Sequence, residues 1–497
     1  MGSSRSRLLY TVQQSFETRA AFALFAAFVS VFLIGALAFA ARGGAAASLL
    51  SLIGLCSAVL LGLAPAPRRA FYVFFIAVSL MLRLSFCLAV QTAPVSDFLL
   101  LYEAAESAAT GDFSVLNTLP YFQNWAYQTG FVAWMAALIR LFGADVLFLQ
   151  CLNCLLQTAT ALVVYATARN FFGERPGRIS AWLFAFSPEA LLLVPVLSNQ
   201  HLSTFLFCAG FLVWLKALEK RPLLPRCLLG AAAGLLCAMG QVIRPVGEAL
   251  FLAVAATLLL VFFADTIRRR WEALRQRAAV MLPPLFAAGL AFLLAFTAAG
   301  QAVRLSGLNQ NGLTNGFPEW KLVLGLNSAS GGMYNDADLD IYTITDPALR
   351  KQVAREVIAE RLRPGDGALL KLTLKKTLRF WGSGGSAEWI VSEGSVGVYG
   401  RTAEFFAAMP SMYHAVLYAL LLGFALARVQ KKDTDIRTLW LIALIGVYAG
   451  IHFLIEIQPR YRDFAMPAVM ILSGGAVERL YCLASRRQKR PLGAKKT

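Results

Sequence analysis

Long apolar segments alternate with short polar segments over most of the chain. A helix needs about 20 apolar residues to cross the hydrocarbon core of a bilayer, and lipid offers no partner to an unpaired backbone group. The pattern therefore predicts an all-α polytopic membrane protein with about 12 membrane-spanning helices. The expected spans are residues 20–41, 45–63, 70–90, 145–167, 178–197, 202–218, 224–242, 246–264, 280–300, 412–428, 437–456 and 463–482.

The stretch after the third span leaves the number of crossings open. Apolar sequence runs from Phe131 to Thr167 with a break at Gly143. Residues 131–141 are too short to span, so we interpret them as an interfacial or re-entrant helix that leads into the span 145–167. If residues 131–141 did cross, the count would be thirteen.

The composition agrees with a membrane protein. Of the 497 residues, 58% are hydrophobic and 15% are charged, whereas an average soluble domain has about 25% charged residues. The net charge of +18 comes mostly from short basic loops, which the positive-inside rule places in the cytoplasm with both termini. These basic segments include the N-terminus with Arg5 and Arg7 and the tail from Arg486 to Lys496. They form no single basic face, so they do not indicate nucleic-acid binding.

The same charge argument places five polar segments outside the cell: residues 91–130, 198–201, 240–248, 304–409 and 456–463. They hold nearly all of the unusual polar residues. This indicates an active site at the outer surface, whereas a transporter more often has its polar site near mid-bilayer.

The chain is accordingly divided into five parts. They are an N-terminal segment with two extra spans (1–69), a transmembrane core (70–303), an extracytoplasmic segment (304–410), C-terminal transmembrane helices (411–482) and a basic cytoplasmic tail (483–497). Because the first apolar run exceeds the roughly 7–15 residues of a signal-peptide core, we expect it to be a retained helix.

Cysteines and acidic clusters predict neither a disulfide framework nor a metal site. The eight cysteines all lie within or at the ends of apolar spans, as small packing residues do. Residues 335–340 have the composition of a calcium loop but not the spacing of an EF-hand. The segment around them predicts two amphipathic helices, over 346–361 and 369–381, the second of them basic and lying on the membrane.

Asp97 is the leading candidate for a catalytic group. It lies just past the span 70–90, at the start of a long aromatic loop, where a carboxylate would work at the bilayer surface. The alternative is that Asp97 only caps the helix that begins at Phe98. Aromatic residues favour the headgroup level, and their flat faces can also stack on sugar rings. Four of them in this loop are candidate substrate-binding residues: Tyr102, Tyr121, Trp125 and Tyr127.

Cations at or near the outer ends of spans are candidate phosphate ligands. Guanidinium binds phosphate through two parallel hydrogen bonds, and a charge next to a span is costly unless it has a partner or a function. The four candidates are Arg244, Arg460, Arg83 and Arg462. An ion pair with Glu248 is the alternative for Arg244. The remaining predicted substrate-binding residues are Gln200, His201, His452, Glu456, Gln458 and Tyr461.

Taken in order, several short motifs resemble the GT-C superfamily of membrane glycosyltransferases, which includes protein mannosyltransferases and the lipid A aminoarabinose transferase. The motifs are an arginine-bearing span, Ser96-Asp97 with Tyr102, Phe142-Gly143, Phe172-Gly173, Ile243-Arg244-Pro245 and Gln458-Pro459-Arg460-Tyr461. The run Trp320…Gly325-Leu326-Asn327 with Gly331-Gly332 and Asn335 resembles bacterial members of the mannosyltransferase-like branch, glycosyltransferase family 39.

The resemblance covers about residues 71–480, and the chain departs from it in two places. Two extra spans precede the usual core. Many members carry a second acidic residue where this chain has Ser198-Asn199-Gln200-His201, which speaks against a two-carboxylate or metal-dependent mechanism.

The resemblance implies a GT-C fold and an inverting transfer of a sugar from a polyprenyl-phosphate carrier to a glycan, lipid or protein acceptor at the extracytoplasmic face. Asp97 would hold or deprotonate the acceptor hydroxyl. Arg244 and Arg460, with Arg83 and Arg462 behind them, would stabilise the departing phosphate. The expected partners are the lipid-linked sugar, membrane lipids and the acceptor, with no cofactor. The rival interpretation is a transporter or flippase of a lipid-linked saccharide, whose basic headgroup sites would look similar.

Overall fold

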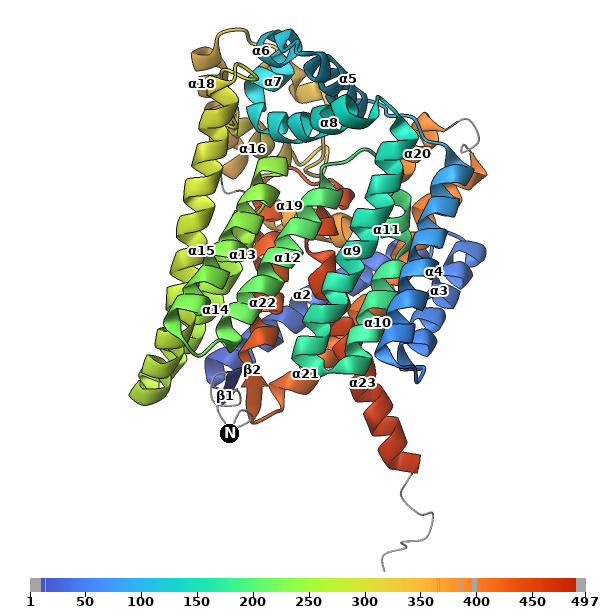
Figure 1. Cartoon of the computed structure of the whole chain (residues 1–497), viewed down its shortest axis with the longest axis vertical. Helices are drawn as coiled ribbons and strands as arrows, with labels where there is room; N and C mark the ends of the chain where they lie inside the picture. Colours follow the sequence, from blue (N-terminus) through green and yellow to red (C-terminus); the bar gives the residue numbers. More distant parts are fainter. Residues whose placement is uncertain are drawn as a thin grey trace, which may run out of the picture.

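The computed structural model describes residues 10–13, 15–363, 365, 367–384, 387–395 and 400–488. Within them, eleven helices are long and apolar enough to cross a membrane, so the prediction of an all-α polytopic membrane protein is confirmed. Figure 1 shows most of them packed side by side as a bundle. They are α2 (Phe16–Ala40), α3 (Ala45–Leu63), α4 (Arg68–Val90), α9 (Val146–Phe172), α12 (Gln200–Glu219), α13 (Leu223–Ile243), α14 (Glu248–Ile267), α15 (Trp271–Leu305), α21 (Arg401–Val429), α22 (Ile436–Leu454) and α23 (Met466–Gln488).

The expected span 178–197 is divided into two shorter helices, α10 (Glu174–Ala185) and α11 (Pro188–Leu193). The break follows from the sequence, because the hydroxyl of Ser187 caps α11 and Pro188 is its first residue. Most residues of both helices are buried, so the pair packs inside the bundle. Of the twelve expected spans, this one is therefore not among the eleven helices of the described residues that are able to cross a membrane.

Short helices form a cap at one end of the bundle (Figure 1). The first part of the cap comprises α5 (Asp97–Thr110), α6 (Ser114–Thr118), α7 (Pro120–Asn124), η1 (Ala126–Gln128) and α8 (Thr129–Phe142). Helix α8 lies crosswise to the bundle at its end, and it is not among the helices able to span. Both observations agree with the interfacial helix expected over 131–141.

The second part of the cap comes from the segment 304–409. Its helices are α16 (Glu319–Gly325), η2 (Asp336–Asp338), α17 (Leu339–Tyr342) and α18 (Pro347–Leu362). In the acidic cluster of this segment Asp338 is buried, and its carboxylate accepts hydrogen bonds from Arg361, Asn327 and Asn335, whereas Asp336 and Asp340 are exposed. The chain then continues into α19 (Ala368–Gly382) and α20 (Ala387–Gly394).

Helix α19 matches the amphipathic helix predicted over 369–381. One of its faces packs against α2 and against the end of α22. Lys376 lies on this face and is 1% exposed. Of the basic residues of the helix, Lys376 is therefore part of the interior, whereas Lys371, Lys375 and Arg379 are exposed.

Close helix packing in the bundle is clearest between α13 and α15. Gly230 and Gly234 are one turn apart on α13, and a Cβ at either would lie 2.4 Å or less from a backbone oxygen of α15. Small residues four positions apart let two membrane helices approach to backbone contact. This pair anchors the helix whose last residue, Ile243, precedes Arg244.

The opposite end of the bundle carries a short antiparallel pair of strands, β1 (Thr11–Gln13) and β2 (Asp433–Asp435), with Thr11 opposite Asp435. Figure 1 places this pair near the N-terminus and away from the cap. Of the expected basic segments, Arg5 and Arg7 and the tail beyond residue 488 lie outside the described residues.

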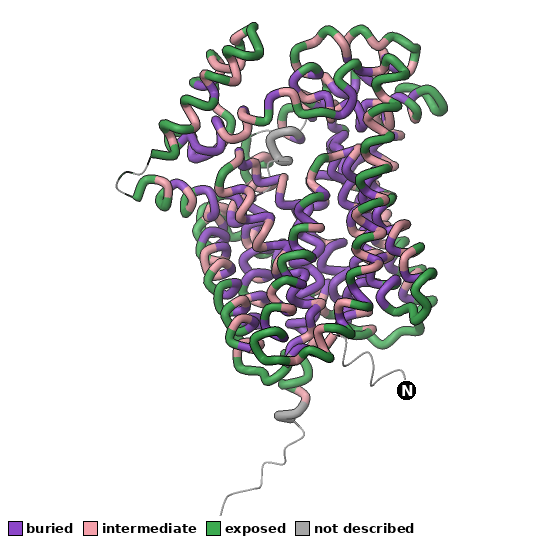
Figure 2. Tube along the Cα trace, turned by 90° about the vertical axis from the view of Figure 1, so that its left-hand side faces the viewer, coloured by how far each residue is buried: buried purple, intermediate pink, exposed green. Residues whose placement is uncertain are grey.

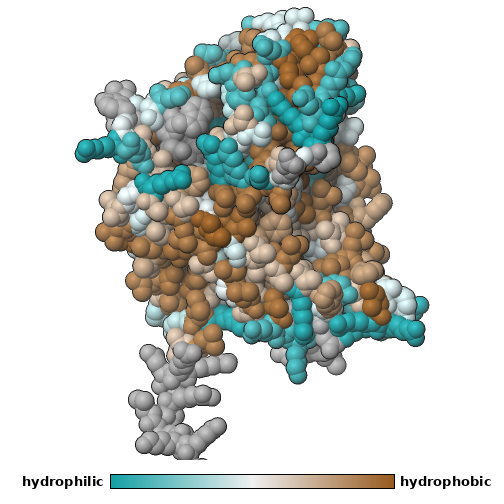
Figure 3. Space-filling model, turned by 180° about the vertical axis from the view of Figure 1, so that it is seen from behind, coloured by the Kyte–Doolittle hydropathy of each residue, from teal (hydrophilic) through white to brown (hydrophobic). Residues whose placement is uncertain are grey.

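The surface has the distribution expected of a membrane protein. Figure 3 shows a hydrophobic band around the middle of the molecule, bounded by hydrophilic residues at both ends. Apolar side chains in the bundle are exposed, as with Phe286 of α15 (73%) and Val73 of α4 (71%). Figure 2 shows buried residues along the inside of the bundle from end to end. A protein in water would not leave such a band uncovered.

Candidate active site

A cavity of about 680 Å³ lies where the cap meets the bundle. Its walls come from the start of α5, from residues 121–128, from the loops before α12 and α14, from α16 and α17, and from the end of α22 with η3 (Pro459–Phe464). Eleven of the fifteen predicted site residues line it: Asp97, Tyr121, Trp125, Tyr127, Gln200, Arg244, His452, Glu456, Gln458, Arg460 and Tyr461. Residues between positions 97 and 461 thus line one cavity.

The other four predicted residues do not line this cavity. Arg83 is fully buried on α4 and donates to the carbonyl and hydroxyl of Ser79. Arg462 is fully buried and pairs with Glu189 of α11 at 3.0 Å. His201 is bonded to Gln157 and to two backbone carbonyls. Tyr102 packs among apolar residues of α5 and α8.

Asp97 is the first residue of α5, and its side chain does not cap the helix. The N-cap residue is Ser96, and no side-chain cap bond is formed there. Ser96 has φ +52° and ψ −133°, a conformation that costs a non-glycine residue about 1–3 kcal/mol. Such strain persists where the surrounding structure holds it, and here it sets the direction in which the helix begins. Asp97 is therefore not the N-cap residue of α5, as the alternative interpretation had it.

Asp97 is exposed to the cavity, where protein surrounds it and cations lie nearby. Among the described residues its carboxylate has no hydrogen bond or ion pair, and it is accessible from the cavity. Desolvation by the surrounding protein raises the pKa of Asp97, and the positive charges of Arg460 and Lys321 oppose that rise. A carboxylate with a raised pKa and no partner is suited to accept a proton.

Three cations surround the ring of Tyr461. The guanidinium carbon of Arg244 lies 5.0 Å from the ring centroid, that of Arg460 5.8 Å, and Nζ of Lys321 5.8 Å. All three residues line the cavity beside Asp97. The cluster is suited to bind an anionic group such as a phosphate.

Hydrogen bonds fix two of these cations. Arg244 donates to the side-chain oxygen of Asn199 at 2.9 Å, and no ion pair with Glu248 is present among the described residues. The side chain of Gln200 donates to the backbone carbonyl of Arg460 at 2.6 Å. Asn199 thus holds the guanidinium of Arg244, and Gln200, the first residue of α12, holds the backbone of Arg460, although this segment lacks the acidic residue of many GT-C members.

Lys321 was not predicted as a site residue. It lies on α16 and forms an ion pair with Glu456, and this pairing raises its pKa although burial opposes the effect. Glu456 is 1% exposed, and Lys321 together with Gln458 keeps its pKa low against the effect of burial. A single lysine inside the apolar run Trp320–Leu324 was the available sequence signal, because a charge among apolar residues needs a partner or a function. Asn199, Tyr334, Tyr342 and Tyr448 also line the cavity and were not predicted.

Helix α16 is fastened directly to the end of α22. The backbone N–H of Glu456 donates to the carbonyl of Lys321 at 2.8 Å. The ammonium of Lys376 donates to the carbonyls of Gly325, Phe453 and Ile455 at 2.7–3.0 Å. These bonds satisfy carbonyls left free at two helix ends. The joint holds Lys321 and Glu456 together at the cavity.

Gly325 makes this joint possible, and Gly325→Ala should disrupt it. A Cβ at this position would lie 2.2 Å from the carbonyl oxygen of Leu454, so α16 must move away. We expect a loss of about 1–3 kcal/mol of stability, as for other overpacked sites, together with reduced activity. Thermal unfolding of the purified protein measures the first effect. Gly423→Ala is the matched control, because nothing lies within 4 Å of a Cβ there; equal stability of the two variants would contradict the joint.

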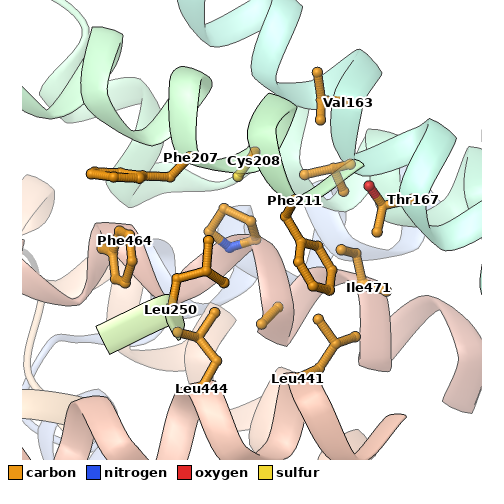
Figure 4. A pocket seen from close by; sticks show the side chains of 13 residues that line it. Val163, Thr167, Phe207, Cys208, Phe211, Leu250, Leu441, Leu444, Phe464 and Ile471 are labelled. Atoms are coloured by element: carbon orange, nitrogen blue, oxygen red, sulfur yellow. The ribbon is translucent and has the colours of Figure 1, made fainter. Parts of the chain in front are cut away.

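An apolar crevice lies deeper in the bundle. It is lined by side chains of α9, α12, α14, α22 and α23 together with Phe464, and it encloses about 40 Å³. Figure 4 shows mainly aliphatic and aromatic groups converging there, with Cys208 and Thr167 as the labelled side chains bearing sulfur or oxygen. The crevice offers no acid–base or phosphate chemistry, whereas the cavity under the cap offers both.

The family model of the dolichyl-phosphate-mannose-protein mannosyltransferases matches residues 128–287, about a third of the chain. This match supports a membrane glycosyltransferase of the GT-C superfamily. The matched region runs from the end of η1 to the middle of α15, and it includes the cavity residues Asn199, Gln200 and Arg244. A comparison with curated proteins gives no match. Asp97, Glu456 and Arg460 lie outside the matched region, so their roles are argued from their positions in the cavity.

Proposed function

We propose that this glycosyltransferase moves a sugar from a polyprenyl-phosphate carrier to an acceptor hydroxyl, with inversion at the anomeric carbon, in the cavity under the cap. The observation that carries the proposal is the position of the Asp97 carboxylate, which has no hydrogen-bond or ion-pair partner in the part of the chain that the structure describes, beside the cation cluster of Arg244, Arg460 and Lys321. The cavity lies at the end of an apolar bundle, where the phosphate of a membrane-anchored carrier would be found.

Each reacting group then has a counterpart in the cavity. The acceptor oxygen attacks the anomeric carbon and forms the new glycosidic bond, while the bond from that carbon to the phosphate oxygen breaks. The proton of the acceptor hydroxyl passes to Asp97. The electron pair of the broken bond stays on the phosphate, whose increased negative charge is stabilised by Arg244 and Arg460. Lys321 adds a third positive charge, which Glu456 partly balances.

The reaction can be tested with purified protein in detergent. Polyprenyl-phosphate-linked sugars and envelope glycans extracted from the same cells supply donor and acceptor, and mass spectrometry follows the sugar from one to the other. We expect the carrier to lose its sugar and the acceptor to gain it. A flippase needs a sealed bilayer to show activity. If the lipid-linked sugar stayed intact in detergent but crossed the membrane of a vesicle that contains the protein, the proposal of glycosyl transfer would be wrong and a flippase would be the better explanation.

We further propose that the cap lies outside the cell and that both termini are cytoplasmic, because the basic loops gather at the end opposite the cap. In a variant without native cysteines, a membrane-impermeant maleimide should label Gln123→Cys and Asp340→Cys in intact cells. Lys432→Cys should react only after lysis. All three positions are exposed. If Lys432→Cys alone were labelled in intact cells, the cap would be cytoplasmic and the proposed orientation would be wrong.

A further inference from the structure

The cavity has a second wall of different character, built from aromatic rings. The ring of Trp125 is stacked on that of Tyr342, with centroids 5.5 Å apart and planes at 11°. Tyr121 contacts Trp125 edge-on at 4.9 Å, and Trp320 contacts Tyr342 at 5.5 Å. These rings come from α7, the residue after it, α16 and α17, and all four line the same cavity as Asp97. We call these four residues the aromatic wall.

Asp97 lines the same cavity as the aromatic wall and the cation cluster. Its charge acts on Arg460 and Lys321 of the cluster and also on Tyr121 of the wall. A carrier phosphate bound to the cations would thus place its sugar beside Asp97. The aromatic wall offers a second surface in this cavity, along which an acceptor hydroxyl can reach the same carboxylate.

Uncharged amides also lie near the wall. Gln128 donates to the hydroxyl of Tyr121 at 3.4 Å, and Asn199 donates to Gln128 at 3.1 Å. Asn315 lines the cavity as well. An amide group both donates and accepts hydrogen bonds, as a sugar hydroxyl does. Flat rings that meet apolar C–H faces, with amides at the edge, match the two sides of a sugar ring.

The wall suits an extended peptide less well. A peptide usually binds to the free edge of a sheet or in a groove between helices. The strands that the structure describes, β1 and β2, lie at the opposite end of the molecule. Near the aromatic wall the backbone is mostly helical, so most of its N–H and C=O groups are already bonded. Side chains must therefore provide recognition.

Resting on the proposed function, we propose that the acceptor is a saccharide that lies against Trp125 and Tyr342 and presents one hydroxyl to Asp97. A cavity of about 680 Å³ falls within the range of roughly 300–1,000 Å³ usual for small-ligand sites. The same cavity must also hold the phosphate and sugar of the carrier, so the acceptor occupies part of it as a compact group bound through its ring faces. This assignment differs from the protein acceptor that the name of the matching family implies.

The test separates the acceptor wall from the carrier site by using two kinds of probe. Saturation-transfer NMR on the purified protein reports contact with a panel of methyl glycosides and disaccharides, or with a hexapeptide rich in serine and threonine. Titration with farnesyl phosphate reports the cation cluster and serves as a check of folding. We expect saccharide contact in the wild type and affinity lower by about tenfold or more in Trp125→Ala, since aromatic anchors dominate binding sites. Trp125→Phe should restore most of the affinity.

Trp271→Ala is the matched control, because Trp271 is 54% exposed on α15 and is not in the cavity. It should bind the saccharides as the wild type does. Contact with the hexapeptide instead of the saccharides would overturn the proposal in favour of a protein acceptor. Saccharide affinity that is equal in Trp125→Ala and Trp271→Ala would also overturn it. Failure of the wild type to bind farnesyl phosphate would instead count against the proposed glycosyl transfer, because that probe does not use the aromatic wall.

Discussion

Asp97→Asn should lower turnover by about 10²-fold or more while the protein still folds. General-base catalysis contributes about 10²–10⁴-fold, and asparagine keeps the shape of the side chain while removing its charge and basicity. The carboxylate has no hydrogen bond or ion pair among the described residues, so its loss leaves no buried partner behind. Sugar transfer at saturating donor, together with thermal unfolding, measures the two halves of this prediction.

The matched control is Asp112→Asn. Asp112 lies on the same part of the cap, is exposed, and accepts a hydrogen bond from the backbone N–H of Ser114. Its replacement should leave turnover within about twofold, since surface changes have small effects. Full activity of Asp97→Asn would show that the carboxylate of Asp97 takes no part in the reaction.

The pH dependence gives an independent measurement on Asp97. A base must be deprotonated to act, so activity should fall as the pH drops through its pKa. Because desolvation raises the pKa of Asp97 above its ordinary value, the acid limb of kcat/KM should lie above the range of an exposed aspartate. An acid limb at or below that range would indicate that another group controls the reaction.

The helices could be predicted largely from hydropathy, because each apolar segment has to be helical in lipid. The break at Ser187 and Pro188 was missed, since the residues on both sides are equally apolar and burial in the bundle does not require one continuous helix. The burial of Lys376 was not predicted, because the sequence gives the amphipathic face of α19 but not the helix that packs against it. The element that packs against a given helix face is set by the tertiary structure, and the sequence of that helix alone does not identify it.

The prediction of the site residues was limited in the same way, because the sequence does not identify the partner of each charged side chain. A charge beside a span indicates a partner or a function, and the sequence does not distinguish the two. Arg460 and Arg462 are two residues apart in η3, and only Arg460 lines the cavity, whereas Arg462 points inward to Glu189. Arg83 gives the same sequence signal and is buried in the bundle. Lys321 was overlooked because its partner Glu456 is 135 residues away.

Arg244→Ala and Arg460→Ala should each raise the barrier to sugar transfer by about 2–4 kcal/mol, the usual effect of removing one group that stabilises developing negative charge. Arg460→Lys should keep part of the activity, because an ammonium supplies charge but not two parallel hydrogen bonds. The measurement is kcat/KM for the carrier-linked sugar, with farnesyl phosphate affinity as a second reading. The contrasting variant is Arg462→Ala. It leaves Glu189 without its buried ion-pair partner and should lose much of its thermal stability.

The acid limb of the pH profile separates a catalytic Arg460 from a structural one. The positive charge of Arg460 lowers the pKa of Asp97. Without that charge the pKa rises further, so the acid limb of kcat/KM in Arg460→Ala should move to higher pH, and in Arg460→Lys it should stay near the wild-type position. A residue that only supports the fold would change stability without moving the limb. An unmoved limb in Arg460→Ala, with normal farnesyl phosphate binding and a large loss of stability, would therefore take Arg460 out of the active site.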